Sequence, residues 1–528
     1  MQKRAGVLIA AGALVAGAVT AAPSAAEPSA PEPRTPLRWS ACATQQYPKL
    51  ECATLPVPLD HAAPEGERIT LALSRIRHTA RTSQGPLLVN PGGPGGSGRT
   101  LAGFVASSLP ASVAAQYDVI GFDPRGVGAS RPALDCRPGH FAPVRPDSVP
   151  RDQREERAGL ARAAAFARAC DGKHGRLLPF MDTVSTARDL DAIRAALGAP
   201  RINYLGYSYG TYLGAVYAKL YPHRVRRAVL DSVVHPGGVW YDANMAQNHA
   251  FDARHKAFLA WVARHDAVYR LGTDPARVEA RWYAMRSALR AEPAGGTVGP
   301  AELEDTYLPG AYHDGHWPVL AAAFAAYAVD GDAGPLVDAY ESIARPDAAS
   351  DNGYAVYTAV ECRDARWPTS WDVWHRDHWA AHAKSPFSTW NNAWYNAPCA
   401  FWPVPPLTPV DVANDALGPV LLFQADQDAA TPYEGAVATR GLLPGSRLVV
   451  ERGGGNHGVT LRGNACADRI LARYLATGEV PPGDRGAGAD AWCPAAPEPE
   501  PAPAAARRAP APAPVPVHGA RGALPRGN

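Results

Sequence analysis

The sequence predicts an α/β protein, with a mostly parallel central sheet, helices on both faces and an inserted, largely helical cap. Short apolar runs alternate with helical segments between about residues 40 and 236, a pattern typical of parallel strands joined by helical crossovers. Residues 237–410 are instead rich in Trp, Tyr, Ala, His and Asp in helical patterns. Strand-like runs return within 411–494, so the cap interrupts one sheet domain.

The N-terminus predicts an export signal over residues 1–26. Lys3 and Arg4 precede an apolar run over 5–19, and small residues follow at 24–26, as in a cleaved signal peptide. The apolar run is short for a bilayer span, so we expect no stable membrane insertion after signal removal. Residues 27–39, rich in Pro and Ala, form a linker or a short propeptide. These features predict a secreted protein.

Composition narrows the possible partners. The 528 residues carry a formal net charge of only +2 and no basic block, so no nucleic-acid partner is expected. The eight cysteines fit an oxidising compartment. Their connectivity is open, and pairing between neighbours along the chain is the simplest guess: Cys42–Cys52, Cys136–Cys170, Cys362–Cys399 and Cys466–Cys493. The sequence leaves the oligomeric state undetermined.

Hydrophobic periodicity places the elements in order. The core, residues 40–236 and 411–494, is expected to hold strands at 86–90, 117–122, 202–205, 226–231, 418–424 and 446–450, and a helix at 186–197. The cap is expected to hold helices at 250–265 and 275–291. Residues 495–528 are rich in Pro and Ala with few large apolar side chains, which predicts a disordered tail.

The segment Gly206-Tyr207-Ser208-Tyr209-Gly210 predicts a nucleophile. It reads Gly-x-Ser-x-Gly, and it lies between the expected strand at 202–205 and an apolar helical run at 211–220. A serine on a tight strand-to-helix turn projects its hydroxyl above the sheet, and flanking small residues let the backbone turn. Ser208 is therefore the expected nucleophile of a serine hydrolase.

A serine hydroxyl needs a base, and the base needs an orienting carboxylate. His457 follows the 446–450 strand within a glycine-rich loop, whereas the later His518 falls in the predicted tail. Asp426 and Asp428 both follow the 418–424 strand. We favour Asp428 as the acid, because Thr431 in the same turn is placed to hydrogen-bond and support it.

An oxyanion site is expected in the glycine-rich loop at 89–98, which follows the 86–90 strand. The expected donors are the backbone N–H of Gly93 and that of Tyr209, the residue after the nucleophile. A nucleotide site is not expected, since no Gly-Lys-Ser/Thr occurs in the loop. No cofactor is predicted.

Five segments, NPGGPGGSG, GFDPRGVGAS, YLGYSYGTYLG, DQDAATP and GGNHG, together resemble the secreted tripeptidyl aminopeptidase branch of the proline iminopeptidase-like serine peptidases. The resemblance covers about residues 40–495. It implies an α/β-hydrolase fold with a helical cap, the triad Ser208, Asp428 and His457, and removal of short peptides from free N-termini. Pro91 stands where the iminopeptidases have a histidine, which favours the tripeptidyl branch.

An exopeptidase must recognise the substrate's α-ammonium group, usually with a carboxylate. Glu361 is the candidate, because a disulfide at Cys362 would hold its backbone; the alternative is a surface glutamate paired with Arg363 or Arg366. No metal site is predicted, although histidines recur at helical spacing at 375, 378 and 382.

The sequence thus predicts a secreted serine exopeptidase that releases short peptides, with tripeptides as the expected product, from substrates with a free N-terminus. Fold and motifs do not separate peptide from ester substrates. A secreted carboxylesterase or lipase with the same triad and a proline iminopeptidase therefore stay as alternatives. A non-catalytic binding protein on a hydrolase scaffold is the alternative of another class.

Overall fold

The computed structural model describes residues 37–483 and 488–502. The predicted signal peptide, most of the predicted linker and the last part of the predicted tail lie outside the described residues. Within those two ranges, no helix combines the length and the apolar character that a membrane span requires.

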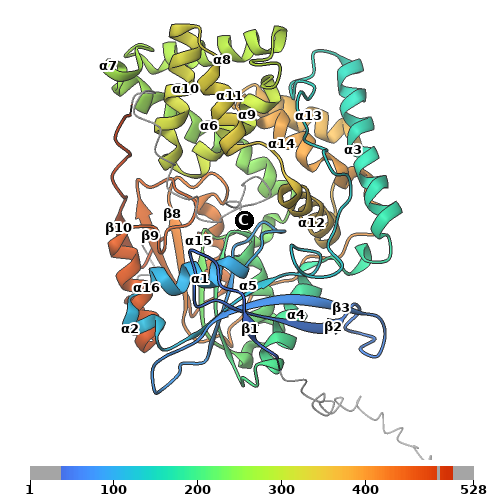
Figure 1. The fold of residues 1–528 in the computed structure, drawn as a ribbon, viewed down its shortest axis with the longest axis vertical. Coiled ribbons are helices and arrows are strands. Elements are labelled where there is room, and N and C mark those ends of the chain that lie inside the picture. Colours follow the sequence, from blue (N-terminus) through green and yellow to red (C-terminus); the bar gives the residue numbers. More distant parts are fainter. Residues whose placement is uncertain (1–36, 484–487, 503–528) are drawn as a thin grey trace, which may run out of the picture. The chain divides into compact units, whose positions relative to one another are not determined.

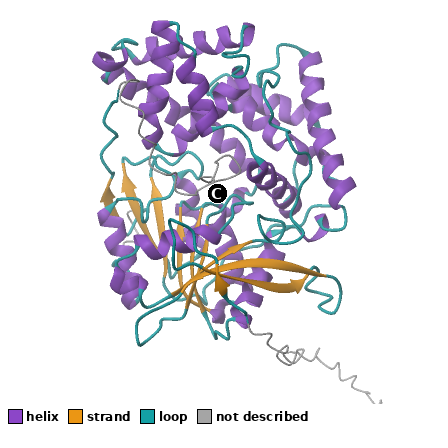
Figure 2. Cartoon of the chain, viewed as in Figure 1, coloured by secondary structure: helices purple, strands orange, loops and turns teal. Residues whose placement is uncertain are grey.

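Ten strands of the described residues form one sheet, in the order β1-β2-β3-β5-β4-β6-β7-β8-β9-β10. Their bounds are β1 Ser40–Ala41, β2 Glu51–Pro58, β3 Arg68–Ile76, β4 Pro86–Asn90, β5 Asp118–Asp123, β6 Ile202–Tyr207, β7 Val225–Asp231, β8 Val420–Ala425, β9 Arg447–Arg452 and β10 Ala491–Pro494. The pairs from β1 to β5 are antiparallel, and all pairs from β5 to β10 are parallel. The predicted mostly parallel sheet is confirmed, and Figure 2 shows the sheet beneath a mass of helices.

Helices cover both faces of the sheet because its central strands are apolar on both sides. Along β4, Leu88 packs with one buried cluster, and its neighbours Leu87 and Val89 pack with another. The first cluster includes side chains of α4 (Thr183–Ala196) and α5 (Tyr209–Leu220). The second includes side chains of α1 (Arg99–Ser108) and α16 (Ala465–Thr477). The remaining core helices are α2 (Ala111–Ala114), α15 (Tyr433–Leu442), η1 (Leu178–Phe180) and η2 (Pro222–Arg224).

Between β7 and β8 the described chain forms helices and loops and no strand, in keeping with the helical cap that was predicted. The helices are η3 Pro236–Gly238, α6 Tyr241–Arg264, α7 Asp266–Tyr269, α8 Pro275–Ala291, α9 Pro300–Tyr312, η4 Asp314–His316, α10 Trp317–Asp330, α11 Gly334–Ile343, α12 Ala348–Asp364, α13 Trp371–His382, α14 Thr389–Asn396 and η5 Ala397–Phe401. Many of them share a buried cluster built around Trp261, Trp282 and Trp317. Figure 1 shows α6 to α11 together, beyond the carboxyl ends of β8 and β9.

A second segment packs on the cap, although the prediction assigned all of 40–236 to the core. Helix α3 (Gln153–His174) and the loop before it lie between β5 and α4 in the chain. Arg145 of that loop pairs with Glu302 and Asp305 of α9, and Glu156 of α3 accepts a hydrogen bond from Trp371 of α13. These partners are more than a hundred residues apart in the chain, so local sequence patterns do not reveal the contact.

The predicted tail at 495–528 begins with residues that the structure describes. The Glu498 carboxylate pairs with Arg264 of α6, and the Pro499 carbonyl accepts a hydrogen bond of 3.2 Å from the Trp261 indole. Proline lacks an N–H but keeps its carbonyl acceptor, so a proline-rich stretch can bind donors on a helix surface. The low content of apolar residues did not indicate this contact.

All eight cysteines are paired in disulfides, each between neighbours in the order of cysteines along the chain. The pairs are Cys42–Cys52, Cys136–Cys170, Cys362–Cys399 and Cys466–Cys493. The third pair joins the C-terminal part of α12 to η5. It therefore holds the backbone next to Glu361.

Replacing Gly121 with alanine tests the packing of β5 against α1. A Cβ at this position would overlap the carbonyl oxygen of Gly98, the residue before α1, so we expect a loss of about 1–3 kcal/mol of stability. Gly172→Ala is the matched control, because nothing lies within 4 Å of its Cβ position on α3; it should gain about 0.5–1 kcal/mol. Urea midpoints measure both, and equal midpoints would contradict the packing argument.

Candidate active site

Ser208 lies on a strained turn between β6 and α5. Its backbone dihedrals are φ 57° and ψ −127°, a region that costs a non-glycine residue about 1–3 kcal/mol. Two contacts hold it there: the Ser208 N–H donates to the Asp231 carbonyl at 2.9 Å, and the Ser208 carbonyl accepts from the Thr211 hydroxyl at 2.6 Å. The turn places the serine directly before the first residue of the helix, as the motif predicts.

The two glycines that flank Ser208 are required by space. A Cβ at Gly206 would overlap the carbonyl oxygen of Gly210, and a Cβ at Gly210 would lie 2.8 Å from Oδ1 of Asn90. Close backbone approach across the turn, rather than a positive φ, therefore explains the Gly-x-Ser-x-Gly pattern.

The glycine-rich loop after β4 lies directly against this turn. A Cβ at Gly92 would lie 2.9 Å from Cβ of Ser208, and the Gly92 N–H is fixed by a 2.9 Å hydrogen bond to the Asn90 side chain. Gly93, with φ 118°, borders the same cavity as Ser208 and Tyr209. Tyr209 is the first residue of α5, where a backbone N–H has no acceptor within the helix. Both predicted oxyanion donors thus belong to residues of one cavity wall.

The loop after β8 distinguishes the two candidate acids. Asp428 is buried and bonds the His457 Nδ1 at 2.8 Å through Oδ2. It also accepts from Thr431, at 3.1 Å from the N–H and 3.0 Å from the hydroxyl. Asp426 instead accepts from the Gly453 N–H. The geometry therefore brings Asp428, Thr431 and His457 together, and Asp426 only caps the loop.

His457 is buried, and its second nitrogen is free to act. Nε2 has no hydrogen-bond partner among the described residues. With Nδ1 donating to a carboxylate, Nε2 is the basic nitrogen of the neutral ring. Thr431 links this pair to Ser208, because its hydroxyl lies 3.4 Å from Nδ1 and its side chain lines the cavity that Ser208 also lines.

Asp231, which no sequence pattern singled out, holds the loop that carries the histidine. Its carboxylate accepts from the Val459 N–H at 2.9 Å and from the N–H and hydroxyl of Thr460 at 2.7 and 2.6 Å. The next residue, Ser232, accepts from the Gly458 N–H at 2.7 Å. Burial raises the pKa of Asp231, and these donors oppose the shift. Asp231 lies at the carboxyl end of β7, the strand next to β6, which leads to Ser208. This position in the sequence could have indicated a role near the active site.

The cap holds the same loop from the other side. The His457 N–H donates to the Tyr312 carbonyl at 2.8 Å, and the Tyr312 ring meets the imidazole edge to face at 5.4 Å between centroids. Asn456 and Asp314 exchange hydrogen bonds of 2.9 and 3.0 Å. The position of the base therefore depends on both the core and the cap.

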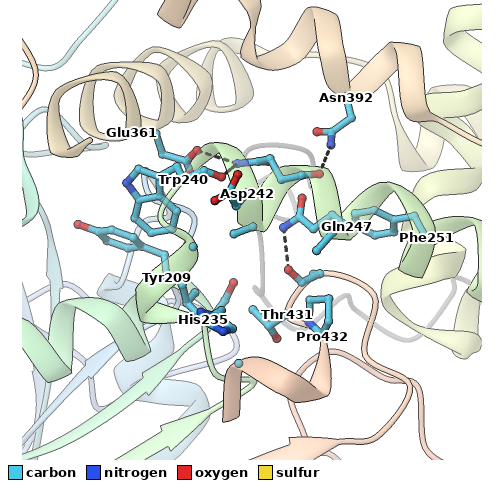
Figure 3. A pocket seen from close by; sticks show the side chains of 18 of the residues that line it. Tyr209, His235, Trp240, Asp242, Gln247, Phe251, Glu361, Asn392, Thr431 and Pro432 are labelled. Atoms are coloured by element: carbon cyan, nitrogen blue, oxygen red, sulfur yellow. Dashed lines mark hydrogen bonds between the residues drawn. The ribbon is translucent and has the colours of Figure 1, made fainter. Parts of the chain in front are cut away.

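A cavity of about 470 Å³ joins these residues to the cap (Figure 3). Among the described residues, its lining contains three carboxylates, Asp242, Glu361 and Glu434, and no lysine or arginine. Apolar and aromatic side chains make up much of the wall, among them Trp240, Phe251, Leu308 and Tyr312. The lining suits a ligand with an apolar body and a positive charge.

Glu361 is the buried carboxyl of this cavity, not the surface residue of the alternative interpretation. Its side chain accepts a hydrogen bond from Asn244 at 3.3 Å, and Tyr357 lines the same cavity. Arg363 points elsewhere and binds the Pro179 carbonyl. Burial raises the pKa of Glu361 well above its ordinary value.

Two of the three histidines of α13 bind polar groups of the protein. His375 pairs with Glu156, and His378 bonds the Trp374 carbonyl at 2.9 Å. Across the described residues, no group of three or more His, Cys, Asp or Glu side chains is arranged to hold a metal ion.

Comparison with known proteins adds relatives that cover most of the chain. Residues 385–487 match the family described as TAP-like protein, and residues 85–321 match the family described as alpha/beta hydrolase fold. A tripeptidyl aminopeptidase of Streptomyces lividans is 47% identical over 459 residues, 84% of each chain. The serine protease Hip1 of Mycobacterium tuberculosis is 32% identical over 85% of this chain and 90% of its own. Carboxylesterase B of the same species is 31% identical over 84% and 88%.

Glu361→Gln tests the ionisation of the buried carboxyl through stability. With its pKa raised in the folded state, Glu361 keeps a proton that the unfolded chain releases above about pH 4.5. Stability then falls as the pH rises from the unfolded pKa towards the folded one. Glutamine cannot ionise, so the variant should gain stability relative to the parent as the pH rises above about 4.5, the ordinary pKa of a glutamate.

Urea unfolding across this pH range measures the difference. Glu434→Gln is the control, because Glu434 lines the same cavity but is exposed. A difference between Glu361→Gln and the parent that does not change with pH would contradict the argument.

Proposed function

The chain belongs to the tripeptidyl aminopeptidase family of α/β-hydrolases, and from this premise we propose that it is a serine exopeptidase that releases short peptides, chiefly tripeptides, from free N-termini. The observation that carries the proposal is one cavity that Ser208 and the buried carboxyl of Glu361 both line. Figure 3 supports this, because Glu361 and Thr431 lie on different sides of the cavity. A peptide bound in this cavity would place its amine at Glu361 and its scissile bond at Ser208.

In the proposed reaction, Ser208 Oγ attacks the scissile carbonyl while His457 Nε2 takes its proton. Asp428 holds the imidazole by Nδ1 and stabilises the imidazolium that forms. The N–H groups of Gly93 and Tyr209 stabilise the negative oxygen of the tetrahedral intermediate. The imidazolium then protonates the leaving amine, which leaves an acyl-enzyme. Water, activated by the same histidine, releases the acyl group as a short peptide.

Glu361 is proposed to bind the substrate's α-ammonium group. In the empty cavity burial favours the neutral acid. A cation within about 4–6 Å favours the carboxylate instead, so the arriving ammonium converts Glu361 to an ion-pair partner. Asn244 supports the anionic form, because its amide N–H donates to Oε2. An uncharged N-acetyl group offers Glu361 no positive charge.

We also propose that the protein is secreted after removal of residues 1–26. Four disulfides support this, since such bonds form and persist in oxidising compartments. We propose the domain division expected from the sequence, a core at 40–236 and 411–494 with a cap at 237–410. The segment with α3 is added to the cap because of its ion pairs with α9.

A carboxylesterase is the second candidate function. It is favoured by the 31% identity to a protein named carboxylesterase B. The same triad can attack an ester, and the apolar part of the wall suits an acyl chain. A buried carboxyl without an ion pair has no use in binding a neutral ester, so Glu361 favours the peptidase.

Substitution of the proposed acid tests the triad. Asp428→Ala should lower kcat by about 10⁴-fold, because the imidazole loses its orienting partner. Asp426→Ala is the matched control from the same loop and should stay within about threefold of the parent, since it caps a backbone N–H. Ser208→Ala should abolish turnover and labelling by a fluorophosphonate probe. Equal losses from the two aspartate variants, or labelling of Ser208→Ala, would refute the assignment.

A substrate panel tests the exopeptidase and its amine site. A tripeptidyl p-nitroanilide with a free N-terminus should be cleaved faster than its N-acetylated form, a prolyl p-nitroanilide or p-nitrophenyl butyrate. Losing one charge-assisted contact costs about 1.5–3 kcal/mol, so acetylation or Glu361→Gln should lower kcat/KM by about 10- to 100-fold.

Acetylation and Glu361→Gln remove the same interaction. In the Glu361→Gln variant, acetylation of the substrate should therefore lower kcat/KM little further. Faster cleavage of the butyrate ester than of the free tripeptide would favour the carboxylesterase. Cleavage of the acetylated peptide as fast as of the free tripeptide would refute the proposed amine site at Glu361.

A further inference from the structure

Asp364 is a buried carboxyl for which the proposed reaction has no use. It is the last residue of α12, one turn beyond Glu361. Its carboxyl accepts three hydrogen bonds: from the Thr183 N–H at 2.8 Å, from the Thr183 hydroxyl at 2.5 Å and from the Trp240 indole at 3.4 Å. It makes no ion pair within the described part of the chain. Burial raises its pKa to about 7.

Thr183 connects Asp364 to Tyr209, the residue after the nucleophile. Its hydroxyl oxygen also lies 2.8 Å from the hydroxyl of Tyr209. When Asp364 is ionised, the single Thr183 hydroxyl proton is donated to it, so the oxygen of Thr183 accepts from Tyr209. A directed chain of hydrogen bonds therefore runs from Tyr209 through Thr183 to Asp364.

This chain fixes Tyr209 at both ends. The backbone of Tyr209 starts α5 directly after Ser208, and its hydroxyl is held within a fully buried network. Between the two ends, its ring packs on Trp240 with centroids 5.9 Å apart. The side chain therefore has little freedom to rotate, and the direction of the Tyr209 N–H is constrained with it.

The first turn of α6 also supports the end of the cavity where the amine is proposed to bind. Asn244 donates both to Glu361, at 3.3 Å, and to the carbonyl of Trp240, at 3.0 Å. The Trp240 indole in turn donates to Asp364. Figure 3 shows Tyr209, Trp240 and Glu361 following one another along one side of the cavity. The residues at its two ends thus share one set of hydrogen bonds between α6 and α12.

We propose that Asp364 is a positioning residue that acts through Thr183 to aim the Tyr209 N–H at the oxyanion. The inference deepens the proposed function and rests on it for the role of Tyr209. A donor aimed at charge that develops only in the transition state raises kcat and leaves substrate binding unchanged. Loss of the chain should therefore affect turnover and not KM.

Thr183→Val tests the chain, because valine keeps the shape and removes the hydroxyl. We expect kcat for the tripeptidyl p-nitroanilide to fall about tenfold, less than the 10²- to 10³-fold that loss of a whole donor costs. KM should stay within about twofold. The affinity for a tripeptide aldehyde, which forms a tetrahedral adduct with Ser208, should weaken by the same factor as kcat/KM. Thr183→Ser restores the hydroxyl and should restore kcat.

Ser185→Ala is the matched control. Ser185 is buried in the same turn of α4, and its hydroxyl also binds a carboxylate, that of Asp182, but it has no contact with Tyr209. Its kcat should match the parent. An equal loss of kcat in Ser185→Ala and Thr183→Val would overturn the proposal, because general loosening of α4 would then explain both. A rise in KM at unchanged kcat, or an unchanged kcat, in Thr183→Val would also overturn it.

Two further measurements cover the remaining outcomes. If Thr183→Val does not fold, Tyr209→Phe breaks the same chain at its other end and should show the same fall in kcat at constant KM. Each variant is also assayed with p-nitrophenyl acetate, whose hydrolysis at Ser208 needs the oxyanion donors but no amine site. A parent that cleaves the acetate and not the tripeptide would refute the proposed function, while the acetate rates would still support or overturn the role of Asp364.

Discussion

Asp231, the last residue of β7, binds the nucleophile turn with its main chain and the histidine loop with its side chain. Its carbonyl accepts the N–H of Ser208, and its carboxylate accepts three donors from Val459 and Thr460. Removing such a buried acceptor leaves several donors unpaired, at about 1–3 kcal/mol each. The relative position of nucleophile and base therefore depends on one buried residue, and the strained backbone of Ser208 persists because of it.

The cap takes part in the same arrangement and is more than a lid. Gln247 of α6 donates to the carbonyl of Ala430, beside the acid, and the Tyr312 carbonyl of α9 accepts from the N–H of His457. A Cβ at Gly95 of the oxyanion loop would overlap the main chain of α12. Each of these loops thus meets a helix of the cap. A cap that moved as a rigid body would disturb the acid, the base and the oxyanion loop together.

Local pattern and chain order were sufficient to predict the parallel strands from β4 to β9 and the pairing of Asp428 with His457. They did not indicate the antiparallel strands β1, β2 and β3 or the short strand β10. Buried strands such as 86–90 are continuous apolar runs, and Asp428 stood out from Asp426 because Thr431 follows it at turn spacing. The features that the sequence did not predict depend on contacts between distant segments. Asp231 and Asp364 appeared as ordinary strand-end and helix-end residues, since their partners Thr460 and Thr183 lie far along the chain. The contacts of helix α3 with the cap were not foreseen for the same reason.

In the proposed function, helix α12 contributes to both ends of a bound substrate through Glu361 and Asp364. Both carboxyls are buried at the end of α12 without a cation; burial raises the pKa of each, and the charge of Asp364 raises the pKa of Glu361 further. In the proposed function, an arriving ammonium supplies the missing positive charge at Glu361. The negative charge that Glu361 then takes on offsets the ammonium, so the ion pair brings little net charge to Asp364 one turn away. The ionised Asp364 is the form that holds Thr183 most firmly, so the proposed chain of hydrogen bonds to Tyr209 is strongest above the pKa of Asp364, about 7.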